Sequence, residues 1–194
     1  MKKFALFLGV LIAFAFGVWY FLLGARPLSE IFPDSTKNEE IIPNLIKVLS
    51  PKFAEGAFIP IEYTCDDENI NPPLVISGVP KEAKSLALIV EDPDAPLGTF
   101  GHWVLWNISP ETVEIKERET PEGAVLGKND FNSEKYRGPC PPNSTHRYYF
   151  KIYALDRLID LPAGSYREDL IKSMKGHVIA QGQLMAKYSR YQKE

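Results

Sequence analysis

The sequence predicts a mainly β fold made of antiparallel strands. Residues 85–91 and 102–108 are nearly continuous apolar runs rich in β-branched and aromatic side chains, as in strands buried on both faces. Residues 147–155 instead alternate, so that every second side chain falls on the same face. Proline and glycine are dense between these runs, which is typical of tight turns. These patterns favour a sheet protein over a helical one.

An uncharged run occupies residues 4–24, directly after Lys2 and Lys3. As a helix it would extend about 31 Å, which matches the hydrocarbon core of a bilayer at roughly 30 Å. A cleavable signal peptide usually has a shorter apolar stretch, and Leu23-Gly24-Ala25 is a poor cleavage site. We therefore expect residues 1–25 to form an uncleaved transmembrane signal anchor with the domain on the extracytoplasmic side. Secretion after cleavage is the alternative.

Residues 26–44 contain three prolines, several carboxylates and little apolar periodicity, so we expect an extended tether. The remainder, residues 45–194, is expected to form one domain, since a chain of 194 residues with 45% hydrophobic content can bury a full core. The formal net charge of the chain is −3, and without Lys2, Lys3 and Arg26 the exported part has 19 basic and 25 acidic residues, a net charge of −6. An acidic domain without a basic run argues against nucleic acid as a partner.

Two further elements are expected near the C-terminus. A helix is predicted to begin at Ser165, because Glu168 three residues later completes a capping box and an apolar stripe follows. Gly176 would end this helix. Residues 178–185 are the last predicted strand, in which Gly182 would mark a bend or bulge.

Two polar motifs lie at the ends of the predicted strands. The first is Asp92-Pro93-Asp94-Ala95-Pro96 followed by Gly101-His102-Trp103, and the second is Gly138-Pro139-Cys140-Pro141-Pro142 followed by His146-Arg147-Tyr148. His146 and Tyr148 are two residues apart on a strand, so they share a face. Polar groups gathered at strand ends are typical of a small ligand pocket. From the residue types alone, scattered structural roles would be the more common explanation.

These motifs resemble those of the phosphatidylethanolamine-binding protein (PEBP) or Raf kinase inhibitor-like family, in its bacterial and archaeal branch. Tyr63-Thr64-Cys65-Asp66, Asn71-Pro72-Pro73 and Gly176-His177-Val178 also match that branch in order and spacing, and the resemblance covers roughly residues 48–190. It implies a PEBP-like antiparallel β-sandwich with Greek-key connections and a few peripheral helices.

The resemblance also implies a site for an anion or head group. Its ligand-binding residues would be Asp92, His102, Gly138, Pro139, His146 and Tyr148, with Asp94, Trp103 and Cys140 in support. Imidazoles, a tyrosine hydroxyl and backbone N–H groups near Gly138 can donate hydrogen bonds to phosphate oxygens. Asp92 would orient a histidine or meet a ligand ammonium group, whereas His177 is interpreted as structural.

Cys65 and Cys140 are the only cysteines. An exported domain permits a disulfide, and the resemblance places both residues in loops near the pocket. Two unpaired, partly buried thiols are the alternative, which the sequence leaves open.

The function expected from this reading is non-catalytic binding or regulation. The ligand would be a small phosphate-type anion, such as a phospholipid head group, a nucleotide or a phosphorylated ligand, with no metal and no cofactor. The partners would be the membrane, through the N-terminal helix, and a kinase or a protease; a homodimer also stays open. One alternative is a metal-dependent or hydrolytic enzyme that uses Asp92, His102 and His146, although no HExxH or Gly-x-Ser-x-Gly motif is present. Another is a surface protease inhibitor.

Overall fold

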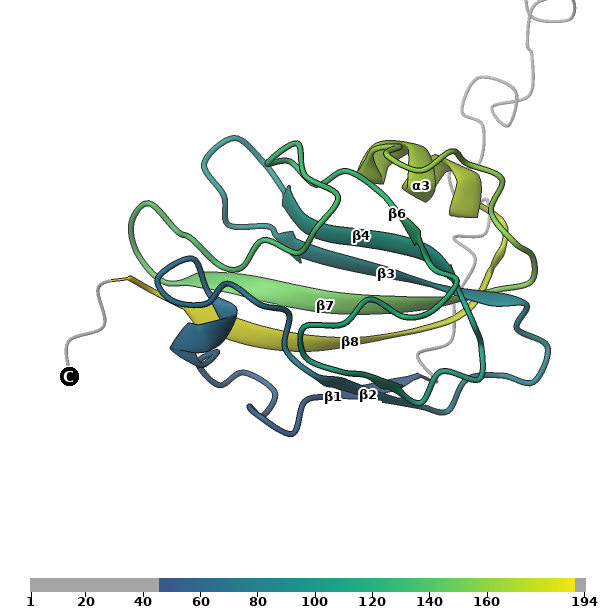
Figure 1. Cartoon of the computed structure of the whole chain (residues 1–194), viewed down its shortest axis with the longest axis horizontal. Coiled ribbons are helices and arrows are strands. Elements are labelled where there is room, and N and C mark those ends of the chain that lie inside the picture. Colours follow the sequence, from purple (N-terminus) through teal and green to yellow (C-terminus); the bar gives the residue numbers. More distant parts are fainter. Residues whose placement is uncertain (1–45, 191–194) are drawn as a thin grey trace, which may run out of the picture. The chain divides into compact units, whose positions relative to one another are not determined.

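A computed structural model describes residues 46–190 as two antiparallel sheets (Figure 1). The larger sheet has the order β6-β4-β3-β7-β8, and its strands are β6 (Val125–Leu126), β4 (Phe100–Ile108), β3 (Ser85–Asp92), β7 (His146–Leu155) and β8 (Val178–Tyr188). The smaller sheet has the order β1-β2-β5, made of β1 (Lys47–Leu49), β2 (Leu74–Ser77) and β5 (Glu114–Ile115). The prediction of a mainly β, antiparallel fold is confirmed.

The chain order within the larger sheet follows a Greek key. β3, β4 and β6 are adjacent in the sheet and follow one another along the chain, with only β5 of the smaller sheet between β4 and β6, and β7 then returns to lie beside β3. The spatial order β7-β3-β4-β6 puts the fourth strand next to the first, as in that motif. This return brings the start of β7 to the end of β3, where the two polar motifs of the sequence lie.

The long strands follow the predicted runs closely. Every residue of β3 is buried, which fits an apolar run with neighbours on both faces. β7 alternates as expected, with Tyr148, Phe150, Ile152 and Ala154 fully buried on one face. The strands of the smaller sheet have only two to four residues each, so they carry no periodicity long enough to predict.

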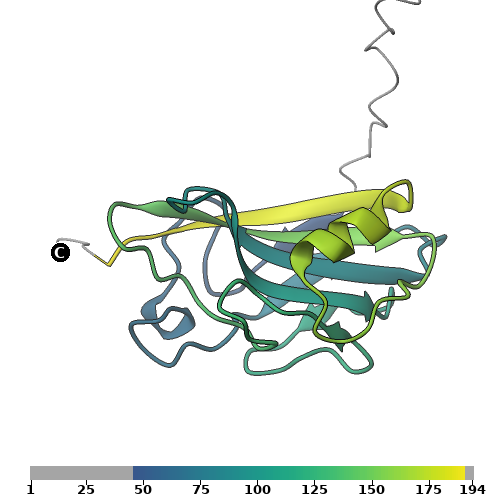
Figure 2. The same ribbon diagram turned by 90° about the horizontal axis from the view of Figure 1, so that it is seen from above.

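The larger sheet is covered on both faces. One face packs against the smaller sheet in a core that includes Leu88, Leu105, Leu74 and Ile76. The other face packs against helix α3 (Arg167–Met174), whose Leu170 and Met174 are buried with partners from β3 and β4 (Figure 2). Besides α3, the described residues contain one short 3-10 helix, η1 (Ile61–Tyr63).

The predicted start of the helix is wrong by one residue. Tyr166 is the N-cap, and its backbone N–H donates to the Asp169 carboxylate at 3.4 Å. The Ser165 hydroxyl donates to the Pro162 carbonyl at 2.7 Å and belongs to the turn that precedes the helix. The helix ends at Met174, and Gly176 follows with φ of +77°, a conformation that favours glycine.

Gly182 does not mark a bulge. Its pairing with Ile152 is regular, and the register shift lies nearer the start of β8, between Val178 and Ala180, opposite Leu155 and Ala154. A Cβ at Gly182 would overlap the carbonyl oxygen of Ile46, whose backbone N–H donates to Gln181. This glycine therefore permits a close approach of two backbones, the other role of glycine in strands.

The expected anchor at residues 1–25, the tether at 26–44 and residue 45 lie outside the described residues. Within residues 46–190, no helix has the length and apolar content to cross a membrane.

Candidate functional site

A cavity of about 150 Å³ lies at the end of the larger sheet, where β3 ends and β4 and β7 begin. Its walls are made by Asp92, Ala95, Pro96, Phe100, His102, Phe131, Cys140, Pro141, Pro142, His146 and Tyr148. Two larger hollows, of about 280 and 510 Å³, contain no fully buried ionisable side chain. The smaller cavity brings together Asp92, His102 and His146, all at most 3% exposed.

Antiparallel pairing explains how distant residues meet in this cavity. Asp92 is the last residue of β3 and pairs with Phe100 at the start of β4, two residues before His102. β7 runs on the other side of β3, so that His146 begins next to the β3 end. The structure therefore brings together four predicted ligand residues, the fourth being Tyr148.

Asp92 and His146 form a buried pair. Nδ1 of His146 donates to Oδ2 of Asp92 at 2.7 Å, and the backbone N–H of Asp94 donates to Oδ1 at 2.8 Å. Because both carboxylate oxygens have donors, Asp92 is fixed in the turn that Pro93 begins. The pair fixes the orientation of the His146 ring and leaves Nε2 as its uncommitted nitrogen.

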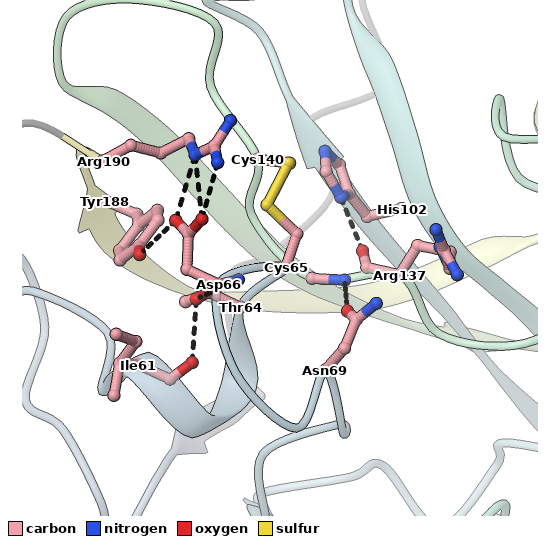
Figure 3. Close-up of a disulfide and its surroundings, with 11 residues drawn as sticks. Ile61, Thr64, Cys65, Asp66, Asn69, His102, Arg137, Cys140, Tyr188 and Arg190 are labelled. Atoms are coloured by element: carbon pink, nitrogen blue, oxygen red, sulfur yellow. Dashed lines mark hydrogen bonds and ion pairs between the residues drawn. A yellow bond between two sulfur atoms is a disulfide. The ribbon is translucent and has the colours of Figure 1, made fainter.

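His102 is oriented by the loop that precedes Cys140 (Figure 3). Its Nδ1–H donates to the Arg137 carbonyl at 2.6 Å, and the Arg137 N–H donates back to the His102 carbonyl at 3.1 Å. Burial lowers the pKa of His102, against the opposing effects of the Arg137 carbonyl and the Asp92 charge. Since the carbonyl can only accept, the neutral ring carries its proton on Nδ1.

Tyr148 supplies a buried hydroxyl that makes no hydrogen bond of standard geometry with residues 46–190, although the Asp92 carboxylate and the Cys140 backbone N–H lie near it. Burial first, and then the nearby Asp92 charge, raise the pKa of Tyr148, so the phenol keeps its proton. Its ring meets His102 edge-on, with centroids 5.3 Å apart. An unpaired buried hydroxyl is costly, and its position in a cavity wall indicates a group that a ligand would satisfy.

Phenylalanine rings enclose the imidazole of His102. The centroid of that ring lies 5.6 Å from Phe100 and 5.4 Å from Phe131, both at steep angles. Sequence reasoning did not select these two aromatic residues, because neither stands in the quoted polar motifs. Together with Pro96, Pro141 and Pro142 they form the apolar part of the cavity wall.

Asp94 and Trp103 act beside the cavity and do not line it. The Asp94 carboxylate receives Nε of Arg147 at 2.8 Å, a second guanidinium nitrogen at 2.6 Å and the Arg147 backbone N–H at 2.9 Å. The Arg147 side chain thereby lowers the pKa of Asp94 to about 2. Trp103 is buried and packs edge-on against Tyr136, with ring centroids 5.7 Å apart.

Gly138 and Pro139 do not line the cavity, contrary to their predicted role. The Gly138 N–H donates to the Asn69 side chain at 2.7 Å, so it is not free for an anion. A Cβ at this position would overlap the carbonyl oxygen of Tyr63. Pro139 accepts a hydrogen bond from the Cys65 backbone at 3.1 Å. These two residues hold the loop in place, and the next three residues form the wall.

A disulfide joins Cys65 to Cys140, with Cα atoms 5.4 Å apart (Figure 3). It connects the loop after η1 to the cavity wall, because Cys140 contributes to that wall. Next to Cys65, Asp66 accepts hydrogen bonds from Tyr188 at 2.7 Å and from Arg190 at 2.9 Å. The wall is thus tied to the end of β8 through the same loop.

The geometry differs from that of a facial metal triad. Nδ1 of His146 donates to Asp92, so these two side chains are hydrogen-bonded to each other, whereas the ligands of a facial triad all point at one metal ion. Within residues 46–190, no cluster of three or more His, Cys, Asp or Glu side chains is arranged to hold a metal ion.

Comparison with known proteins identifies the family. A family model described as phosphatidylethanolamine-binding protein matches residues 49–189. The chain belongs to this family. It is 48% identical over 143 residues to a UPF0098 protein of Methanothermobacter thermautotrophicus, a match that covers 71% of this chain and 95% of that protein. A UPF0098 protein of Pyrococcus abyssi is 47% identical over 155 residues, covering 75% of this chain and 86% of the relative.

Solved structures show the same fold. The crystal structure of a PEBP homologue from Chlamydia trachomatis gives a TM-score of 0.72 at 42% identity, covering 76% of this chain and 99% of that chain. YbcL of Escherichia coli, described as a member of the mammalian PEBP family, gives a TM-score of 0.71 at 29% identity. This match covers 75% of this chain and 98% of that chain. The resemblance to PEBP proteins is thereby confirmed, and the domain has the PEBP fold.

Proposed function

We propose that this protein is a non-catalytic PEBP-family binding protein whose cavity takes a small phosphate-bearing group. The observation that carries the proposal is the buried Tyr148 hydroxyl, which faces a cavity shared with His102 and His146 and makes no hydrogen bond of standard geometry with the described residues. A phosphate oxygen would accept from this hydroxyl and from either imidazole in its protonated form.

The size of the cavity limits the ligand. Pockets for drug-sized molecules usually occupy about 300–1,000 Å³, whereas this one has about 150 Å³. It can enclose a phosphoryl or head group but not a complete lipid or nucleotide. The rest of such a ligand would lie outside, against the apolar rim that includes Phe131 and Pro142.

Asp92 suits a ligand that also carries a positive charge. Its carboxylate contributes to the cavity wall while it orients His146. An ammonium group next to the phosphate, as in phosphorylethanolamine, would relieve the repulsion between Asp92 and the anion. The proposal extends to regulation, in which occupancy of the cavity modulates a kinase or a protease outside the cytoplasm.

Calorimetric titration of the full-length protein with phosphorylethanolamine and with inorganic phosphate tests the proposal. Binding should weaken as the pH rises, because a bound anion favours the imidazolium form of the histidines and binding then takes up protons. His146→Ala should weaken binding and flatten this dependence. His177→Ala is the matched control, because His177 also bonds an aspartate, Asp156, at 3.0 Å but does not line the cavity. Equal binding by wild type and a folded His146→Ala variant would refute the site.

Two further variants separate the roles of the other groups. Tyr148→Phe should reduce phosphate affinity roughly tenfold, the effect of one hydrogen bond to a charged group, with little loss of stability because the hydroxyl makes no hydrogen bond of standard geometry within residues 46–190. Asp92→Ala should weaken phosphorylethanolamine binding more than phosphate binding, because it removes the ammonium partner and eases repulsion of the simple anion.

An enzyme is the second candidate, favoured by the Asp92–His146 pair alone. A carboxylate that orients a histidine is the arrangement of a general base. No serine, threonine or free thiol stands among the wall residues, since Cys140 is in the disulfide, so water would have to be the nucleophile. Release of phosphate from phosphorylethanolamine by wild type, abolished in His146→Ala, would establish catalysis.

A further inference from the structure

Both imidazoles of the cavity have the same nitrogen committed. Nδ1 of His102 donates to the Arg137 carbonyl at 2.6 Å, and Nδ1 of His146 donates to the Asp92 carboxylate at 2.7 Å. A carbonyl and a carboxylate accept hydrogen bonds and have none to give. Each ring therefore keeps its proton on Nδ1, and when neutral it offers only a lone pair at Nε2. In Figure 3 the second nitrogen of His102 lies at the opposite end of the ring from Arg137.

The neutral cavity is consequently poor in donors. Of the side chains in its wall, Asp92 is an acceptor, Cys140 has no thiol proton, and the proline and phenylalanine side chains have no polar hydrogen. Tyr148 is the single neutral side-chain donor among the eleven wall residues. Pro141 and Pro142 also lack backbone N–H groups, and the Gly138 N–H is used by Asn69. The backbone N–H of Cys140 remains, next to the Tyr148 hydroxyl.

We propose that, while its histidines are neutral, the cavity prefers the monoanion of a phosphate monoester to a diester, because the ligand must itself donate a proton to Nε2 of His102 or His146. A monoester binds as its monoanion, whose P–O–H donates to an imidazole while another oxygen accepts from Tyr148. A diester has only acceptor oxygens and needs an imidazolium in the wall. This selectivity rests on the proposed phosphate-binding function and specifies its ligand class.

The groups around the two rings determine when an imidazolium forms. His102 faces Asp92 from β3, Tyr148 from β7, Asp130 and the carbonyls of Arg137 and Gly138. The acidic groups and the carbonyls favour the charged ring, but burial outweighs them and lowers the pKa of His102. His146 faces Asp92, with Asp94 and its Arg147 partner nearby. Where the wall carries an imidazolium, a diester also finds a donor, and the discrimination should then disappear.

Titration calorimetry with methyl phosphate and dimethyl phosphate provides the test, on full-length protein in a phosphate-free non-ionic detergent. At pH 8 methyl phosphate should bind with uptake of about one proton, since its second pKa is about 6. Proton uptake is measured from the difference in heat between two buffers of unlike ionisation enthalpy. Only about 1% of methyl phosphate is monoanion at pH 8, so its affinity is expressed per monoanion. On that scale dimethyl phosphate should bind roughly tenfold or more weakly, the effect of one lost charge-assisted hydrogen bond. At pH 5 the two affinities should converge.

A substitution that supplies a permanent donor gives a second test. His102→Gln replaces a conditional donor with an amide N–H that exists at every pH. It should strengthen dimethyl phosphate binding at pH 8 and reduce the proton uptake that accompanies methyl phosphate. His177→Gln, outside the cavity, is the matched control and should change neither quantity.

The outcomes separate this inference from the proposed function. Methyl phosphate binding at pH 8 without proton uptake, or an affinity for the diester equal to that for the methyl phosphate monoanion, overturns the inference and leaves phosphate binding intact. Failure of both probes to bind at pH 5 and at pH 8 overturns both. If His102→Gln does not fold, the wild-type comparison at the two pH values still decides.

Discussion

Replacing both Cys65 and Cys140 with alanine is expected to cost about 4.5 kcal/mol of unfolding free energy. The disulfide closes a loop of 75 residues. In the chain-entropy treatment, a crosslink of this span removes roughly 15 cal/mol/K from the unfolded ensemble, which is about 4.5 kcal/mol at 25 °C. Native disulfides removed from small secreted domains typically cost 2–5 kcal/mol, a range that includes this value.

Urea unfolding followed by tryptophan fluorescence measures the effect. Trp103 and Trp106 are buried in the two cores, so their emission should report the loss of tertiary structure. With a denaturant slope of roughly 2 kcal/mol/M for a domain of this size, the midpoint should fall by roughly 2 M. Wild type unfolded in dithiothreitol should reproduce the double variant, because the same crosslink is absent.

The same double variant also shows whether the disulfide shapes the cavity as well as stabilising the fold. Cys140 contributes to the cavity wall, so the variant should also bind phosphorylethanolamine more weakly under conditions where it remains folded. A midpoint shift below 0.5 M, roughly 1 kcal/mol at that slope, would refute the assignment of the disulfide as a major source of stability.

Three other predictions follow from single features. The stabilisation from Arg147 should be fully present above the ordinary Asp94 pKa of 3.8 and lost as the pH falls through the folded value of about 2, so the unfolding curves of wild type and Arg147→Ala should converge near pH 2. A constant difference down to that pH would contradict the ion pair. Gly138→Ala should destabilise the domain by roughly 1–3 kcal/mol in urea titration, since its Cβ would overlap the Tyr63 carbonyl oxygen; an unchanged midpoint would show that the loop can shift. Finally, the intact mass of membrane-extracted protein should include residues 4–24, and a mature chain that lacks this run would refute the anchor.

Local periodicity was sufficient for the long strands. β3 and β4 were recognisable because a strand buried on both faces reads as one apolar run, and β7 because its alternate side chains share a face. The short strands β1, β2 and β5 could not be recognised, because two to four residues show no period. Their existence depends on pairing with one another across the sheet.

The sequence by itself determined which chemical groups stand at the strand ends, because Asp92, His102 and His146 directly flank the predicted runs. Only the tertiary structure decided how these groups are used. Nδ1 of His102 bonds a carbonyl 35 positions away, and Nδ1 of His146 bonds a carboxylate 54 positions away. It likewise moved Gly138 and Pro139 out of the cavity wall, since their partners belong to the loop after η1. Hydrogen bonds at such separations depend on how strands and loops pack, so no local pattern of residues encodes them.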